Sequence, residues 1–108
     1  MAWLDYLAYF AGGIFLVNTL PHLVAGVSGR PFQSPFAKPP GVGLSSSRLN
    51  VVWGLINLIV AYVLLCRVGT FDIREIGHVL SAGLGFGLMA FYLASRFGNF
   101  HGGNTPQA

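Results

Sequence analysis

The side chains best suited to chemistry are three histidines, and none belongs to a complete catalytic pattern. Glu75 and His78 form a single ExxH pair, whereas di-iron bundles with this spacing need a second copy and further carboxylates. No phosphate loop, nucleophile elbow or supported cysteine–histidine pattern is present. The sequence therefore favours a protein that is not an enzyme. It assigns no catalytic residue, predicts no metal site and leaves the cofactor unknown.

Polar side chains that interrupt the first two apolar stretches include Asn18, His22, Asn50 and Asn57. Asn18 and His22 are four residues apart and share one helical face around Pro21. A proline inside a helix removes a backbone hydrogen bond, so we expect the helix to kink or end near this turn. The pair is interpreted either as partners for the freed backbone groups or as a binding site.

The composition restricts the class of protein more tightly than these motifs do. Hydrophobic residues make up 54% of the 108 residues and charged residues only 8%. A soluble domain carries about 25% charged residues, and disordered chains are poor in apolar residues. The sequence thus predicts a small integral membrane protein.

The charged residues divide the chain into segments of membrane-spanning length. Uncharged windows cover residues 6–29, 49–66 and 76–95. A helix crosses a bilayer with about 20 apolar residues, so each window is long enough for one crossing. We expect an all-α fold with three transmembrane helices.

The expected helices form one domain, residues 1–97, followed by a mobile tail at 98–108. Their predicted bounds are about 4–27, 48–67 and 73–97. Asp72 and Glu75 are spaced like a capping box at the start of the third helix.

The connection at residues 28–47 is rich in proline and glycine. Prolines fix the backbone, so we expect an irregular segment that lies on the membrane surface or dips into the helices. The serines at 45–47 predict an N-cap for the second helix. Besides ordinary capping, an anion site there, assisted by Arg30, Lys38 and Arg48, stays open.

Two stripes of small and polar residues have spacings of four, three and four. One contains Asn50, Gly54, Asn57 and Ala61, and the other contains Gly83, Gly87, Ala90 and Ala94. Small residues let membrane helices approach closely, and amides form hydrogen bonds between helices. Both stripes are predicted to be helix-packing interfaces, and the second indicates an oligomeric or partner interface.

Basic residues predict the orientation. The first connection and the C-terminal tail are expected on the same side of the membrane, which then holds Arg30, Lys38, Arg48 and Arg96. The opposite side holds only Arg67 and Arg74. The positive-inside rule places the larger group in the cytoplasm and the N-terminus outside, as in a bacterial inner membrane. The net charge of +3 then indicates contact with anionic lipid and not with nucleic acid.

Three functions remain under consideration. In the preferred one, the chain is a non-catalytic subunit or accessory of a larger membrane complex, bound by helix packing and a rigid cytoplasmic loop. The alternative is a homo-oligomeric carrier or channel for a small solute. Its path would be lined by the four polar side chains, with Arg30 and Lys38 attracting an anion. A weaker alternative is a haem, quinone or pigment site formed by His22, Trp53 and phenylalanines.

Overall fold

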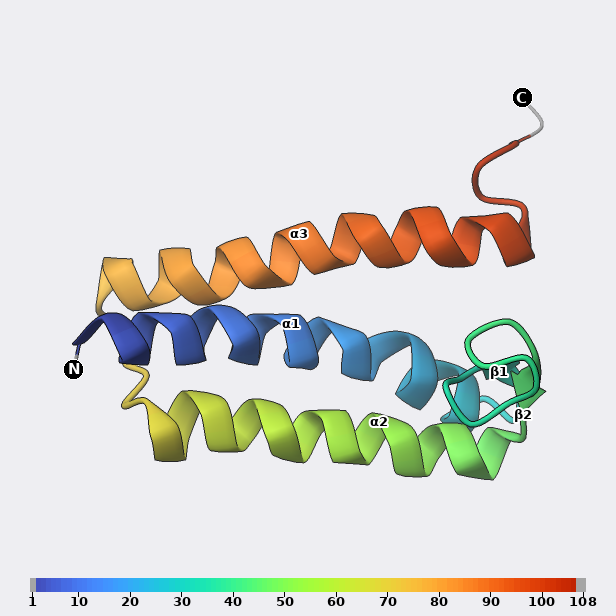
Figure 1. Ribbon diagram of the computed structural model, residues 1–108, viewed down its shortest axis with the longest axis horizontal. Coiled ribbons are helices and arrows are strands. Elements are labelled where there is room, and N and C mark those ends of the chain that lie inside the picture. The colour runs from blue at the N-terminus through green and yellow to red at the C-terminus, as the bar shows by residue number, and fades with distance from the viewer. Residues whose placement is uncertain (1, 107–108) are drawn as a thin grey trace.

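The computed structural model describes residues 2–106 and contains three long helical segments (Figure 1). They are α1 (Ala2–Val27), α2 (Ser47–Tyr62), which continues as the π-helical segment η1 (Val63–Val68), and α3 (Ile76–His101). Two short strands, β1 (Phe32–Gln33) and β2 (Leu44–Ser45), pair antiparallel in the connection between α1 and α2. α1, α3 and the continuous segment of α2 with η1 are each long and apolar enough to cross a membrane.

The helices lie in one layer with α1 in the middle. α1 packs against both α2 and α3, whereas α2 and α3 barely meet (Figure 1). Consequently α1 is the most buried of the three and α3 the least. Hydropathy predicts the length of each helix, but this order depends on which helical faces permit close approach.

Glycines permit the contact between α1 and α3. A Cβ atom on Gly13 would collide with the carbonyl oxygen of Ala82, and one on Gly85 would collide with that of Phe10. The backbones therefore meet directly, a mode of contact that small residues permit.

The contact between α1 and α2 also uses small residues. A Cβ atom on Gly54 would lie 3.0 Å from the backbone nitrogen of Leu23, and one on Gly26 would lie 2.7 Å from the carbonyl oxygen of Ser47. Ala61 is buried further along α2. The stripe that contains Gly54 and Ala61 thus faces α1.

Pro21 does not end the first helix, because α1 continues through it to Val27. The last turns of α1 lean toward α2 in Figure 1. At the other end of the connection, Ser46 caps α2, since its hydroxyl accepts a hydrogen bond of 3.1 Å from the backbone N–H of Leu49.

The third helix begins later and ends later than expected. Its N-cap is Glu75, whose side chain makes no capping hydrogen bond, so the expected capping box does not form. The Asp72 carboxylate instead accepts the backbone N–H of Arg74 at 2.9 Å, which keeps this segment in a turn. At the other end, α3 extends beyond Phe97 to His101.

Tyr9 holds the connection between η1 and α3 against α1. Its side chain is 2% exposed, and its hydroxyl accepts the backbone N–H of Thr70 at 3.1 Å. The imidazole of His78 lies beside the Tyr9 ring, with 4.4 Å between centroids, and accepts the backbone N–H of Asp72 at 3.0 Å. His78 therefore has a local partner that explains its position.

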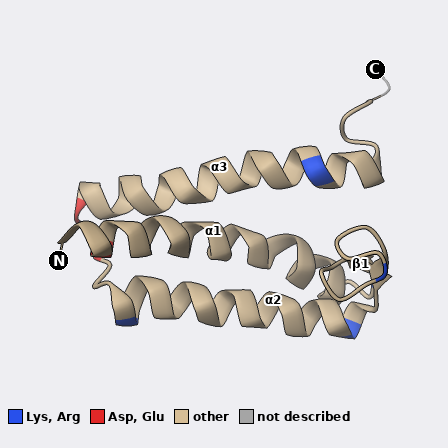
Figure 2. Cartoon of the chain, viewed as in Figure 1, with Lys and Arg blue, Asp and Glu red and all other residues tan. Residues whose placement is uncertain are grey.

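Charged residues are confined to the two ends of the layer (Figure 2). The acidic residues lie at the end that contains the N-terminus, together with Arg67. Arg48 and Arg96 lie toward the opposite end, where the first connection also places its basic residues. The central turns of every helix are uncharged.

The close approach of α1 and α3 predicts different effects for two glycines on α3. Gly85→Ala forces a methyl group into the Phe10 backbone and should cost about 1–3 kcal/mol of unfolding free energy. Gly87→Ala meets no atom within 4 Å and should leave stability unchanged or slightly higher, since alanine favours helices. Unfolding of the purified protein by SDS in mixed micelles measures both. Equal losses for the two variants would contradict this packing.

Candidate functional site

Asn50 is the centre of a buried polar network at the basic end of the layer. The side chain is 0% exposed. Its Nδ2 lies 3.2 Å from the carbonyl oxygen of Phe32, 3.1 Å from that of Ser45 and 3.0 Å from that of Ser46. Its Oδ1 lies 2.9 Å from Nδ1 of His22. One amide thus connects α1, α2 and the strands of the first connection.

This network assigns the proton on the imidazole of His22. The Nδ2 group of Asn50 faces only carbonyl oxygens, so it is the donor and Oδ1 is the acceptor. Nδ1 of His22 therefore carries the proton in the neutral ring and donates to Asn50. The lone pair of Nε2 remains available as an acceptor.

Further hydrogen bonds hold the first connection against the end of α3. The hydroxyls of Ser34 and Ser45 lie 2.5 Å apart, which ties the two sides of the connection together. His101 Nε2 lies 2.9 Å from Gln33 Oε1, and Arg96 Nη2 donates to the carbonyl oxygen of Gly41 at 3.0 Å. The connection is therefore fixed to all three helices.

A second polar pair lies between α1 and α2. Asn18 Nδ2 donates to Asn57 Oδ1 at 2.9 Å, and Asn57 Nδ2 donates to the carbonyl oxygen of Trp53 at 2.8 Å. The structure thus brings all four predicted polar residues to the interface of α1 with α2, but as two separate pairs. Most of their hydrogen-bonding capacity is used within the protein.

The predicted basic residues lie outside this network. Arg30, Lys38 and Arg48 are exposed, and none of them lines the cavity beside His22. Arg96 does line it. The anion site at the start of α2, the alternative to ordinary capping, stays a prediction.

The cavity beside His22, called here the His22 cavity, has a volume of about 170 Å³. Its polar lining comes from every major part of the fold. The residues concerned are Asn18 and His22 of α1, Trp53 of α2, Tyr92 and Arg96 of α3, and Gln33 and Ser34 of the first connection. Phe97 supplies an aromatic wall, with its ring centroid 6.0 Å from that of His22. The site combines hydrogen-bonding groups with aromatic surface.

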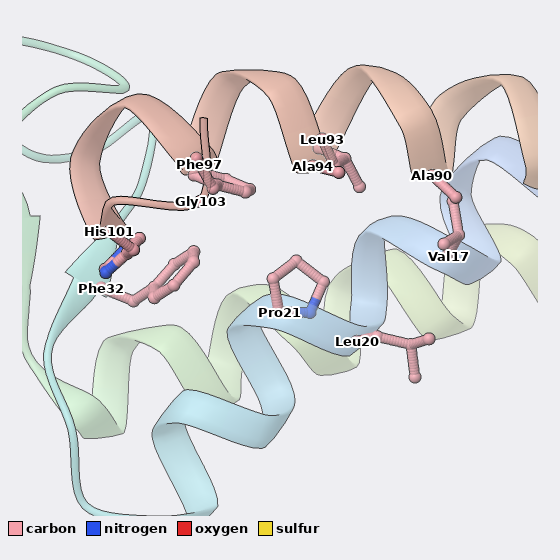
Figure 3. Close-up of a pocket in the computed structure, with 11 residues that line it drawn as sticks. Val17, Leu20, Pro21, Phe32, Ala90, Leu93, Ala94, Phe97, His101 and Gly103 are labelled. Atoms are coloured by element: carbon pink, nitrogen blue, oxygen red, sulfur yellow. The ribbon is translucent and has the colours of Figure 1, made fainter. Parts of the chain in front are cut away.

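A larger, almost entirely apolar hollow of about 400 Å³ lies between α1 and α3 (Figure 3). Its walls include Val17, Ala90 and Ala94. At one end the rings of Phe32 and His101 stack with their centroids 5.0 Å apart. A further hollow of about 200 Å³ between the same two helices is lined by residues that include Gly83. The two hollows together are called the α1–α3 groove.

The small-residue stripe on α3 borders this groove, and neither of its two glycines is pressed against α1. Gly83, Ala90 and Ala94 line the hollows, and an added Cβ on Gly83 or Gly87 would meet no atom within 4 Å. The internal contact uses Gly85 instead. Gly83 and Gly87 therefore leave open space beside α3.

Gln33, His101 and Arg96 are contributors that the sequence analysis did not identify. Gln33 and His101 are 68 positions apart, and His101 falls in the expected tail. They meet only because α3 extends to the level of the first connection, and no spacing rule indicates this. Among residues 2–106, no three His, Cys, Asp or Glu side chains are grouped closely enough to hold a metal ion.

No protein-family model, curated protein sequence or solved structure matches this chain. The functional interpretation therefore rests on its own geometry.

Replacement of Asn50 should release the first connection from the helices. Asn50→Ala leaves buried backbone carbonyls and the His22 donor without their partner, and each unpaired group costs about 1–3 kcal/mol. Hydrogen exchange in residues 28–46 should therefore accelerate strongly, as measured by mass spectrometry in detergent.

Asn57→Ala is the matched control, because it removes one amide from the same helix without touching the connection. It should lower stability while leaving exchange in residues 28–46 unchanged. Similar exchange in both variants would show that Asn50 does not hold the connection.

Proposed function

We propose that the chain is an integral membrane protein that acts as a non-catalytic subunit or accessory of a larger membrane complex. The membrane assignment is supported by three apolar segments of sufficient length and by the confinement of charge to the ends of the layer (Figure 2). A charged side chain within the bilayer is costly, so this distribution fits a membrane-spanning layer.

In the proposed orientation the N-terminus lies outside and the first connection lies in the cytoplasm of a bacterial cell. Arg30, Lys38, Arg48 and Arg96 belong to the end that contains the first connection. Arg67 and Arg74 belong to the other end, which also holds every acidic residue. The positive-inside rule favours this orientation, and anionic lipid is the expected partner of the basic end.

The observation that carries the subunit proposal is the open space beside Gly83 and Gly87. Neither glycine is needed for the contact with α1, yet together they form a GxxxG element. A glycine that only faces lipid contributes little, whereas a GxxxG face permits close contact with another helix. The proposed occupant is a transmembrane helix of another subunit, packed along α3 beside the α1–α3 groove.

The first connection provides the second part of the proposed docking surface. Asn50 and Arg96 bond to its backbone and His101 bonds to the Gln33 side chain, so it presents one conformation to a partner. A preorganised segment loses less entropy on binding than a flexible one. Its exposed basic residues, Arg30 and Lys38, favour an acidic partner surface.

The carrier alternative has less support. Asn18 and Asn57 bond to each other, and Asn50 bonds to His22 and to backbone carbonyls. Polar groups that line a solute path need free donors or acceptors, and each of these amides is already engaged in a hydrogen bond within the protein. A single layer of three helices also encloses no path, so a carrier would require several copies.

Orientation is tested with single-cysteine variants, because Cys66 is the only cysteine in the chain. In a Cys66→Ser background, Thr70→Cys and Ser28→Cys place one thiol at exposed positions in the two connections. A membrane-impermeant maleimide added to spheroplasts should label Thr70→Cys only, and Ser28→Cys should react after permeabilisation. The reverse pattern would overturn the proposed orientation.

The docking face is tested with the double variant Gly83→Leu and Gly87→Leu. An added Cβ at either position meets no atom within 4 Å, and we expect the monomer to remain folded with an unchanged SDS unfolding midpoint. Recovery of the partner on affinity purification should fall about tenfold, equivalent to about 1.4 kcal/mol of lost binding energy.

Ile59→Phe is the control for added bulk, since Ile59 is 61% exposed on α2. It should retain the partner. Undiminished recovery with the double glycine variant would refute docking through this face, and recovery of only a second copy of the chain would replace the subunit proposal with self-association.

A further inference from the structure

Two hollows adjoin where α3 reaches the first connection. The larger hollow of the α1–α3 groove, about 400 Å³ in volume, has Phe32 and His101 at one end (Figure 3). A second hollow of about 290 Å³, called here the Arg30 hollow, is lined by Arg30, Pro31, Phe32 and His101. Because Phe32 and His101 line both hollows, the apolar space between the helices lies next to one that a permanently charged side chain lines.

The larger hollow extends from the end of α3 into its apolar middle. Ala90 and His101 both line it, and at a rise of about 1.5 Å per residue the helix between them spans roughly 16 Å. The apolar core of a bilayer is about 30 Å thick, so this length corresponds to about one leaflet. A molecule that fills both hollows therefore needs a long apolar part and a polar group at one end.

The larger hollow is accessible from the lipid side of the protein. Its lining includes Leu20, which is 48% exposed, and Ala94, which is also exposed. α2 packs on α1 and barely meets α3, so no helix among residues 2–106 covers the hollow. An empty space between helices loses the dispersion contacts that an occupant would make. An acyl chain of the bilayer can enter from the side and restore these contacts.

The charge beside the larger hollow favours an anionic headgroup. Among the described residues that line either hollow, Arg30 alone carries a permanent charge, and a guanidinium can bond a phosphate through two parallel N–H donors. Every acidic residue within 2–106 lies at the opposite end of the layer, so no carboxylate there competes with the phosphate. A zwitterionic headgroup would bring an ammonium group to this basic end. Basic pockets between transmembrane helices are known to bind anionic headgroups.

We propose that one anionic phospholipid, from the leaflet at the basic end of the layer, occupies both hollows. One acyl chain lies between α1 and α3 against Val17 and Leu93, and the phosphate lies beside Arg30. The site rests on the proposed membrane insertion, which the cysteine labelling tests separately, and does not depend on the subunit role. Neither Gly83 nor Gly87 lines these two hollows, so a helix docked at those glycines leaves the lipid in place.

Binding is tested with two lipids that share the same acyl chains, dioleoyl-phosphatidylglycerol and dioleoyl-phosphatidylcholine. Each is titrated into the purified, delipidated protein in detergent at about 0.15 M salt, and native mass spectrometry counts the lipids retained by each chain. Phosphatidylglycerol should saturate at one molecule per chain and bind about tenfold more tightly than phosphatidylcholine, because only its headgroup is net anionic. Equal retention of the two lipids would overturn the proposal.

Arg30→Gln tests the headgroup contact. Loss of the charge-assisted hydrogen bonds should weaken phosphatidylglycerol binding about tenfold, and the SDS unfolding midpoint should stay unchanged because Arg30 is exposed. Arg48→Gln is the matched control, since it removes the same charge from the same end of the layer but lines neither hollow. Salt screens its longer-range attraction, so it should lose less than about twofold. Equal losses would indicate general attraction to basic residues and overturn the site.

Ala94→Phe tests the position of the acyl chain, because the added ring enters the larger hollow. It should weaken phosphatidylglycerol binding about tenfold. Leu88→Phe is its control, since Leu88 lies on the same helix, is 57% exposed and does not line the hollow. This control and the double variant Gly83→Leu and Gly87→Leu should both bind the lipid normally.

Two results with Ala94→Phe would overturn the proposal. One is unchanged binding of phosphatidylglycerol, which would place the acyl chain elsewhere. The other is loss of a partner polypeptide, or of a second copy of the chain, with the lipid still bound, since a helix would then occupy the hollow. Failure of the subunit proposal alone leaves all of these lipid measurements unaffected.

Discussion

The arrangement of the first connection depends on the hydrogen bonds of one buried amide. Asn50 donates to the carbonyl oxygens of Phe32 and Ser45 and accepts a hydrogen bond from the Nδ1–H of His22, so it joins an irregular segment to two helices. Backbone polar groups near the apolar part of a membrane have little water to bond with, and irregular chain is tolerated there only when protein supplies partners. The same bond orients His22, and hence determines which ring nitrogen faces the cavity.

The single layer of helices gives the fold its unused surface. Because α1 contacts both neighbours through glycines and α2 does not close onto α3, one side of α3 has no partner among residues 2–106. In a compact three-helix bundle the small residues Gly83 and Gly87 would have a neighbouring helix to pack against. Here they border open space. The proposed docking of a partner helix therefore depends on the arrangement of the helices as well as on the spacing of the small residues in α3.

The sequence predicts the helices well because the positions of charged residues limit where an apolar segment can lie. The three segments, the cap at Ser46 and the helical stripe through Gly54 and Ala61 follow from spacing and residue type alone. The order of the helices does not, since several faces carry small residues and only packing selects Gly85 over Gly83. The start of α3 differs because Asp72 bonds locally to Arg74. The bond between Gln33 and His101 depends on the final length of α3 and has no sequence signal.

Native mass spectrometry of the protein, extracted gently from its own membrane, tests the subunit proposal most directly. The proposal predicts a complex in which this chain is accompanied by at least one other polypeptide at a fixed ratio. Detection of the chain only as a monomer, or only as copies of itself, would contradict the proposal.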